Sequence, residues 1–154
     1  MFSVGDRVVH PVYGAGTIVA IEKRQEAERL TSYYVIPTEA PAANLLIPID
    51  RAIDLGLREA ITDEDADEIV KILSDTPAED AHSIDLAKIG KSIKWNDPIA
   101  LARLVRDGTV RAREGRLPMS EKKVLKRAQR LLAGELSLVT GQSLDSIETI
   151  MQIG

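Results

Sequence analysis

Apolar residues recur at two different spacings along the chain, one typical of strands and one typical of helices. As far as Leu57 they form short runs bounded by Gly, Pro, Asn or Asp, which predicts strands. Beyond Thr62 they recur every three or four positions, which predicts amphipathic helices. We therefore expect an α+β protein, with a small antiparallel β module over residues 1–57 and an all-helical module over residues 62–154.

The β module is predicted to contain strands within the segments RVVHP, GTIVAIEKR, LTSYYVIP and NLLIPID. Gly14 and Gly16 flank the start of the second segment, where a tight turn needs positive φ or a close approach of two backbones. The segment Thr38–Asn44 is expected to be a hairpin loop, because its Pro41 has no N–H to donate to a neighbouring strand.

Capping residues set the expected limits of the first helices. Asp63 opens the segment DEDADEIVKILS with carboxylates in the first turn, where the helix dipole favours them. Asp97 is expected to cap a helix that has Pro98 at its first position and ends at Gly108.

The longest predicted helix is EKKVLKRAQRLLAGELSLV, capped by Ser120 and with Gly141 beyond its end. Ser143 is expected to start a last short helix. Because the helices carry their own apolar stripes, the helical module is expected to fold alone. The stripe positions are Ile99, Leu101, Leu104, Val105, Val124, Leu125, Leu131, Leu132, Leu136 and Leu138.

Composition narrows the classes of function. The 154 residues include no cysteine, which excludes disulfides, thiolate metal sites and cysteine nucleophiles. His10 and His82 lie far apart in the sequence, so we expect neither a metal nor another cofactor. No apolar stretch is long enough to span a membrane and none follows a basic start, so we expect a cytoplasmic protein without a membrane partner.

No enzyme signature stands out, and we expect no catalytic residues. The GAG at Gly14 lacks the third glycine and the βαβ context of a dinucleotide site. The acidic DEDADE is more typical of a solvated helix face than of a general acid and base, and HSID lacks the sharp turn that exposes a nucleophile. A hydrolase that uses the acidic helix is the alternative from the enzyme class.

Charge is unevenly distributed, although the net formal charge is −4. Residues 59–85 carry ten acidic side chains and one basic one, whereas residues 86–135 carry thirteen basic and five acidic ones. This reversal indicates surfaces with different partners.

Two basic groups are candidates for phosphate contacts, although a solvated surface would explain them too. One is a lysine every third residue in a helix expected from Leu86 to Trp95, with the Trp as a candidate apolar wedge. The other lies on the longest helix, where lysines in the first turn oppose the helix dipole unless an anion is near. The candidate DNA-binding residues are Lys88, Lys91, Lys94, Trp95, Lys122, Lys123, Lys126 and Arg127.

The segments VGDRVVHPVYGAGTIVAIEKR, SYYVIP, LLIPID and GLREAI resemble the N-terminal module of the CarD/CdnL family of bacterial RNA polymerase-binding transcription regulators. That module also occurs in the transcription-repair coupling factor. The stretch DPIALARLVRDGTVRAREGRLPMSEKKVLKRAQRLLAGELSLV resembles the helical domain of the same family. The resemblance implies a Tudor-like β module that docks on the RNA polymerase β subunit, and a helical domain that meets promoter DNA at the upstream edge of the melted bubble. It further implies a regulator that stabilises the open complex and is not an enzyme; we expect a monomer.

The resemblance also implies where the polymerase-binding surface lies. An exposed strand edge can accept a partner strand through main-chain bonds, which agrees with this assignment. Leu46 departs from many relatives, which have a basic residue just before the equivalent V-P or I-P step. The implied RNA polymerase-binding residues are Arg24, Tyr34, Val35, Ile36, Leu45, Leu46, Ile47 and Pro48.

The DNA-binding half departs further from the family. Relatives have a Trp followed by an Arg-rich stretch upstream of the segment that matches DPIALARLVRD. In ungapped register His82 occupies the Trp position, and Trp95 lies thirteen residues later. The motif therefore does not assign the wedge role to Trp95. An aromatic residue of the core or of an interface explains Trp95 at least as well. We expect promoter DNA to be bound weakly or only within the polymerase complex; the alternative is an adaptor that docks on the polymerase without touching DNA.

Overall fold

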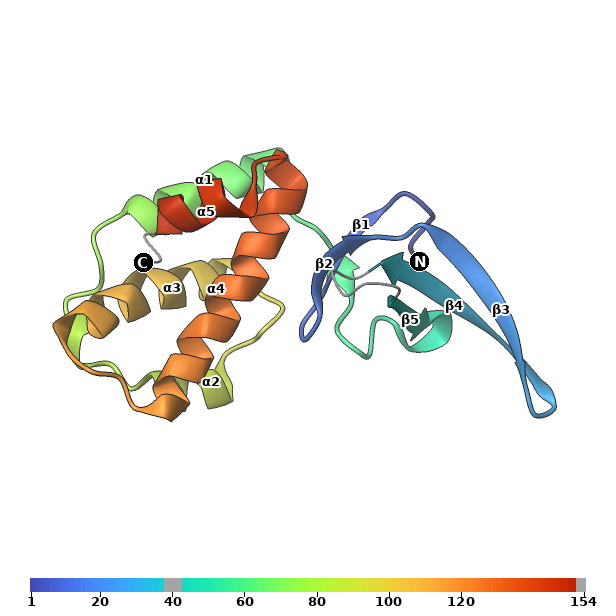
Figure 1. Cartoon of the computed structure of the whole chain (residues 1–154), viewed down its shortest axis with the longest axis horizontal. Coiled ribbons are helices and arrows are strands. Elements are labelled where there is room, and N and C mark those ends of the chain that lie inside the picture. Colours follow the sequence, from blue (N-terminus) through green and yellow to red (C-terminus); the bar gives the residue numbers. More distant parts are fainter. Residues whose placement is uncertain (38–42, 152–154) are drawn as a thin grey trace. The chain divides into compact units, whose positions relative to one another are not determined.

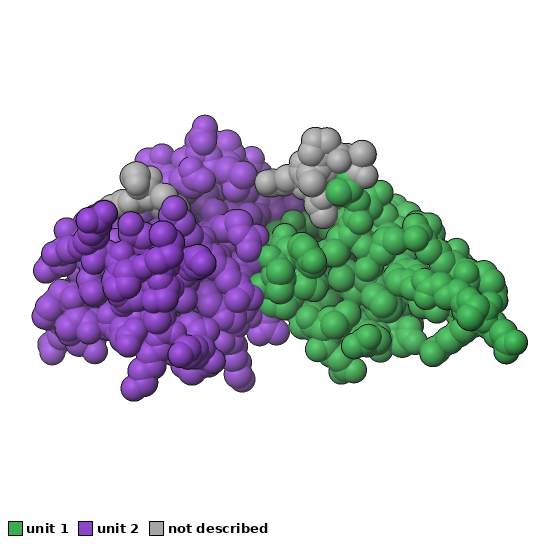
Figure 2. Space-filling view, turned by 60° about the horizontal axis from the view of Figure 1, so that its bottom comes forward, with its two compact units in different colours: residues 1–60 green, residues 61–154 purple. Residues whose placement is uncertain are grey.

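The computed structural model describes residues 1–37 and 43–151 (Figure 1), so most of the expected loop Thr38–Asn44 lies outside the described residues. The chain divides into two compact units, residues 1–60 and residues 61–154 (Figure 2). Antiparallel strands in two small sheets form the first unit and five α-helices follow in the second, which confirms the α+β class.

Unit 1 contains two three-stranded antiparallel sheets, with strand orders β2-β1-β6 and β3-β4-β5. The predicted second strand is wrong as a single strand, because the chain passes from one sheet to the other at Ile18. The Ile18 N–H donates to the Asp6 carbonyl (2.9 Å), whereas the next N–H, of Val19, donates to the Val35 carbonyl in the second sheet (3.0 Å). The elements are β1 (Arg7–His10), β2 (Gly14–Thr17), β3 (Ala20–Glu26), β4 (Arg29–Pro37), β5 (Asn44–Pro48), the 3₁₀ helix η1 (Ile49–Arg51) and β6 (Arg58–Glu59).

The predicted roles of Gly14 and Gly16 are confirmed. Gly14 has φ +88°, and a Cβ at Gly16 would lie 2.5 Å from Cγ2 of Ile36. The second sheet thus packs against β2 at a point where only hydrogen fits. The core of unit 1 consists of Phe2, Val8, Ile18, Tyr34, Ile36, Ile47, Ala52 and Leu57.

Unit 2 is built around its longest helix, α4, against which α1, α2, α3 and α5 all pack. The buried positions of α3 and α4 bear out most of the predicted apolar stripe, including Leu101, Leu104, Leu125 and Leu132. The elements are α1 (Asp63–Ser74), the 3₁₀ helix η2 (Ala81–Ser83), α2 (Leu86–Ser92), α3 (Pro98–Glu114), α4 (Met119–Thr140) and α5 (Leu144–Met151).

Most of the predicted caps are confirmed. The first turn of α1 carries the expected carboxylates, and Thr62 and Asp65 form a capping box there that was not predicted. The Asp97 carboxylate accepts the N–H groups of residues 99 and 100 at the start of α3. Gly141 ends α4 with φ +74°, and the Ser143 hydroxyl accepts the N–H of Ser146 in α5 (3.1 Å).

One predicted limit of α3 and one of α4 are wrong. Gly108 does not end α3 but lies buried within it, because a Cβ there would come within 2.8 Å of Cδ1 of Leu125 on α4. Close helix packing, and not termination, explains this glycine. Ser120 does not cap α4, which begins at Met119 after Pro118.

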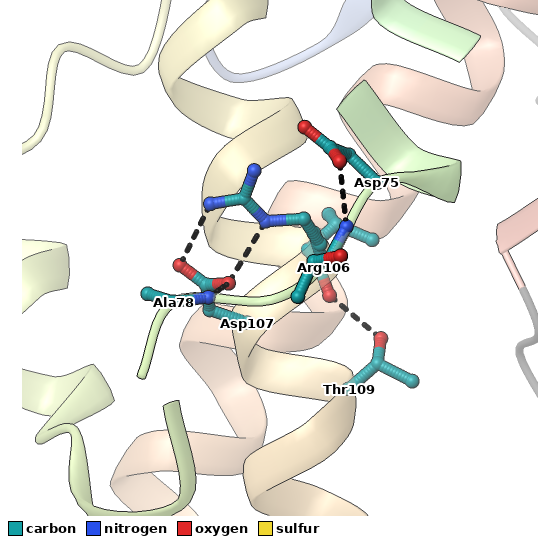
Figure 3. A network of polar contacts seen from close by, with 7 residues as sticks. Asp75, Ala78, Arg106, Asp107 and Thr109 are labelled. Carbon is teal, nitrogen blue, oxygen red and sulfur yellow. Dashed lines mark hydrogen bonds and ion pairs between the residues drawn. The ribbon is translucent and has the colours of Figure 1, made fainter. Parts of the chain in front are cut away.

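The turn between α1 and η2 is fastened to α3 by a polar network (Figure 3). The Asp107 carboxylate accepts the Ala78 N–H at 3.0 Å and the Arg106 Nε–H at 2.9 Å. Both charged side chains are about 15% exposed, and the carboxylate raises the pKa of Arg106. The Asp107 carboxylate therefore connects the irregular segment between α1 and η2 to α3.

Two buried carboxylates on α4 satisfy backbone groups at the starts of other segments. Glu121 accepts the Leu86 N–H at the start of α2 (3.0 Å) and lies 3.6 Å from the Arg111 guanidinium. Glu135, only 1% exposed, accepts the Ile61 N–H (2.9 Å) at the start of unit 2. Each carboxylate binds an N–H group that a helix or sheet leaves without a partner.

Candidate interaction surfaces

The β3-β4-β5 sheet has one face in the core and one face outward. Because side chains alternate along a strand, the register fixes which residues share a face. Pro48 pairs with Tyr33, Leu46 with Val35, and Arg24 with Thr31, whereas Tyr34 pairs with Ile47 across the core side. Arg24, Tyr33, Val35, Leu46 and Pro48 therefore share the outer face.

The structure divides the predicted polymerase-binding residues between these two faces. The side chains of Tyr34, Ile36 and Ile47 are buried in the core of unit 1, with Leu45 packed against them. The main chain of β4 is paired on both sides, with β3 and with β5. Only Arg24, Val35, Leu46 and Pro48 of the predicted set lie on the outer face, and Val35 is itself 6% exposed.

Tyr33 lies at the centre of the outer face and was not among the predicted residues. Its hydroxyl donates to the Glu26 carboxylate at 2.6 Å, and this hydrogen bond raises the pKa of Tyr33. Arg24 lies on the neighbouring strand, paired with Glu22 at 2.9 Å. Successive side chains of a strand point to opposite faces, so a core position for Tyr34 in the segment SYYVI places Tyr33 on the outer face.

The predicted basic residues lie on α2, α4 and the segment that joins α2 to α3. Lys88 and Lys91 are exposed on α2, which ends at Ser92, so the predicted helix to Trp95 is too long and Lys94 lies beyond it. Helix α2 approaches α4 closely: a Cβ at Gly90 would lie 2.5 Å from Cγ2 of Val124.

The Trp95 side chain packs against other residues of unit 2, on α2 and α4. Its indole Nε1–H donates to the Gly90 carbonyl at 3.2 Å, and the Arg127 guanidinium lies 4.0 Å from the ring centroid. Burial, with a contribution from Arg130, lowers the pKa of Arg127. Two of the predicted DNA-binding residues are thus engaged with each other in a cation–π contact.

The start of α4 differs from the expected arrangement of first-turn lysines. Because α4 begins at Met119, its first turn contains Glu121, whose carboxylate is turned inward to Leu86 and Arg111. Lys122 and Lys123 follow that turn, so the dipole alone does not require an external anion. Lys122 and Lys126 line a groove with Arg113 and Arg116, which sequence reasoning did not select.

Neither histidine belongs to a metal site among the described residues, where no cluster of three or more His, Asp or Glu side chains has metal-binding geometry. The buried His10 ring accepts the N–H groups of Val12 and Tyr13 through Nδ1, at 3.0 and 3.2 Å. His82 is exposed on η2. No helix in the described part of the chain has the length and apolarity of a membrane span.

In the described part of the chain, unit 1 thus has strand β5 at the edge of its second sheet, and the helices of unit 2 carry exposed lysines. Residues 2–61 match the family model described as the CarD-like/TRCF RID domain, and residues 68–152 match the CarD C-terminal domain. The chain is 31% identical over 147 residues to the putative transcription factor YdeB of Bacillus subtilis (strain 168), covering 92% of this chain and 94% of that protein. The chain therefore belongs to the CarD-like family of RNA polymerase-interacting transcription factors.

Proposed function

We propose that unit 1 docks on the β subunit of RNA polymerase through strand β5 and the outer face of its sheet, and that the docked protein stabilises the promoter open complex. Membership of a polymerase-interacting family supports the choice of partner. The observation that carries the proposal is the edge position of β5, which pairs with β4 alone among the described strands. Such an edge binds an extended partner segment through main-chain hydrogen bonds.

The outer face supplies side chains suited to specificity in this docking. Leu46 and Pro48 on β5 and Tyr33 on β4 form an apolar band beside the free edge. Arg24 lies two strands away, roughly 10 Å at the usual strand spacing, which is well within a typical interface. Aromatic and arginine side chains in such positions commonly carry much of the binding energy.

The test is a titration of full-length protein against core RNA polymerase. Leu46→Glu is expected to weaken binding by about 10- to 100-fold, because it places a charge in the apolar band. Leu30→Glu is the matched control, because Leu30 lies on the same sheet with the opposite facing and is already 60% exposed. Equal affinities for both variants, with unchanged melting temperatures, would refute docking through this face.

We further infer that unit 2 contacts promoter DNA through exposed lysines, including Lys88, Lys91 and Lys123, once the polymerase holds the DNA nearby. The net charge of −4 supports weak binding of free duplex, at about 10⁻⁵ M or poorer at physiological salt. Docking raises the effective concentration of DNA, so few contacts suffice. Lys88→Gln/Lys91→Gln should shorten the open-complex lifetime and leave polymerase affinity unchanged.

The packing of Trp95 favours a second candidate, an adaptor that docks on the polymerase without touching DNA. A wedge must be free to enter a base step, whereas the Trp95 ring lies against Arg127 and its N–H is bonded to Gly90. If the lysine variants and Trp95→Ala all leave open-complex lifetimes unchanged while polymerase binding persists, the adaptor replaces the DNA-contacting regulator. In both cases the protein acts by binding and not by catalysis.

A further inference from the structure

A groove of about 590 Å³ lies in unit 2 between the end of α3, the turn that follows it, and the first half of α4. Its rim carries the cationic side chains of Arg116, Lys122 and Lys126, beside Arg113, and none of the described residues that line it is acidic. The nearby Glu121 carboxylate is buried and directed at Arg111 and Leu86. Arg116, Lys122 and Lys126 therefore place positive charge on the rim, and no carboxylate lies among the described lining residues.

The helix dipoles account for only part of this charge. Arg113 lies in the last turn of α3 and Arg116 just beyond it, where the dipole favours cations. Lys122 follows the first turn of α4, so the helix dipole does not stabilise its charge, and Lys126 lies one turn later on the same side. Arg116, just after α3, and Lys122 and Lys126, on α4, thus place positive charge around one hollow, and an anion there would relieve the repulsion among these three side chains.

The floor of the groove is apolar, formed by Ala112, Leu117 and Leu125. The volume lies within the range of small-molecule sites, which combine an apolar surface with a few placed polar groups. A DNA backbone phosphate would use the cationic rim and leave this floor empty. A ligand that carries both phosphates and a flat ring matches both parts.

We propose that this groove binds a phosphorylated small molecule of the nucleotide class, with the phosphates on the cationic rim and the base on the apolar floor. Arginine pairs bidentately with phosphate and lysine acts as a point charge, so the rim offers both modes of recognition. Thr109 and Gln129 also line the groove: the Gln129 amide supplies a neutral donor and acceptor for the sugar or base, and the Thr109 hydroxyl, which donates to the Val105 carbonyl (2.6 Å), remains an acceptor. This site is independent of polymerase docking, which the proposed function places in unit 1.

The test is calorimetric titration of the full-length protein with ATP, GTP, tripolyphosphate and adenosine. We expect ATP or GTP to bind with Kd below about 1 mM, tripolyphosphate to bind more weakly, and adenosine not to bind. Lys122→Gln/Lys126→Gln should weaken nucleotide binding by at least about 10-fold, because two charge-assisted contacts are lost. Lys88→Gln/Lys91→Gln removes the same charge from α2, away from the groove, and should leave the affinity unchanged.

Three results would overturn the proposal. One is the absence of nucleotide binding at about 5 mM, far above useful affinity. Another is an equal loss of affinity in both double variants, which would show that only net charge matters. The last is a groove variant that loses duplex DNA binding while the wild type binds no nucleotide, which would assign the groove to the DNA surface. Melting temperatures of both variants establish that each is folded.

Discussion

Gly90→Ala tests the packing of α2 on α4, which positions Trp95 and the α2 lysines. Alanine in a helix is more stable than glycine by about 0.5–1 kcal/mol, so an isolated α2 would gain from the change. In the protein, however, the new Cβ would lie 2.5 Å from Cγ2 and 3.1 Å from Cγ1 of Val124. Carbon atoms prefer roughly 3.5–4.0 Å, so the overlap is about 1 Å.

Val124 has little freedom to relieve this overlap. A β-branched residue within a helix has one strongly preferred rotamer, so α2 must move away from α4 instead. Overpacking of this kind costs about 1–3 kcal/mol, which exceeds the helix gain. We therefore expect Gly90→Ala to destabilise the protein by about 1–2 kcal/mol, which lowers Tm of a unit of this size by roughly 4–16 °C.

Trp95 provides a local assay for the same change. It is the only tryptophan, and its Nε1–H bonds to the carbonyl of the mutated residue. Displacement of α2 should shift the tryptophan emission to longer wavelength, while circular dichroism followed with temperature reports the global loss of stability.

A double-mutant cycle identifies the cause. In a Val124→Ala background the clashing methyl groups are absent, so Gly90→Ala should be neutral or stabilise by about 0.5–1 kcal/mol. The coupling energy between the two positions is then about 1–3 kcal/mol. If Gly90→Ala costs the same in both backgrounds, or stabilises the wild type, close packing of Gly90 on Val124 is not the reason for this glycine.

Three further predictions follow from other contacts. Asp107→Ala should destabilise unit 2 by about 1–3 kcal/mol, because the Ala78 N–H and the Arg106 guanidinium lose their acceptor; urea unfolding measures it. His10 accepts two N–H groups and burial lowers its pKa from 6.5, so the stability it supplies is complete above pH 6.5 and is lost as the pH falls below that value. His10→Asn should reduce the change in the free energy of unfolding with pH. Residues 61–154 alone should show a helical circular dichroism spectrum with cooperative melting, because that unit has its own core.

Each of these predictions has a distinct control. Asp107→Asn keeps an oxygen acceptor for Ala78 and should lose less stability than the alanine variant; equal losses would mean that the turn contact is unimportant. A wild type and a His10→Asn variant with the same dependence on pH between about 5 and 7 would contradict the role of the imidazole. A disordered spectrum for residues 61–154 would mean that the two units share a core.

The sequence predicted the class of fold and most helix starts because those signals are local. A cap such as Asp97 acts on N–H groups two or three residues away, so its meaning does not depend on the rest of the chain. Gly108 shows the limit of such signals. A glycine in a helical pattern indicates either an end or a close approach, and only the position of Leu125 on another helix decides between them.

The candidate surfaces were predicted less completely, since they depend on which way each side chain faces and on distant partners. The change of sheet at Ile18 is hidden in a continuous apolar run, because both sheets need apolar residues there. Grouping Tyr34 with Pro48 as one surface overlooked the alternation that places Tyr34 in the core and Tyr33 outside. The partner of Glu121 lies 35 residues away in the sequence, and no local pattern indicates such a pairing.

The two units meet at consecutive residues, Ala60 and Ile61, and the backbone of each is hydrogen-bonded within its own unit. The Ala60 N–H donates to the Arg7 carbonyl of unit 1 at 2.8 Å, and the very next N–H, of Ile61, donates to the Glu135 carboxylate of unit 2 at 2.9 Å. Two consecutive residues are therefore hydrogen-bonded within different units, and one peptide bond joins them. A partner that binds unit 1 therefore brings unit 2 with it through one peptide bond, which raises the effective concentration of unit 2 near that partner.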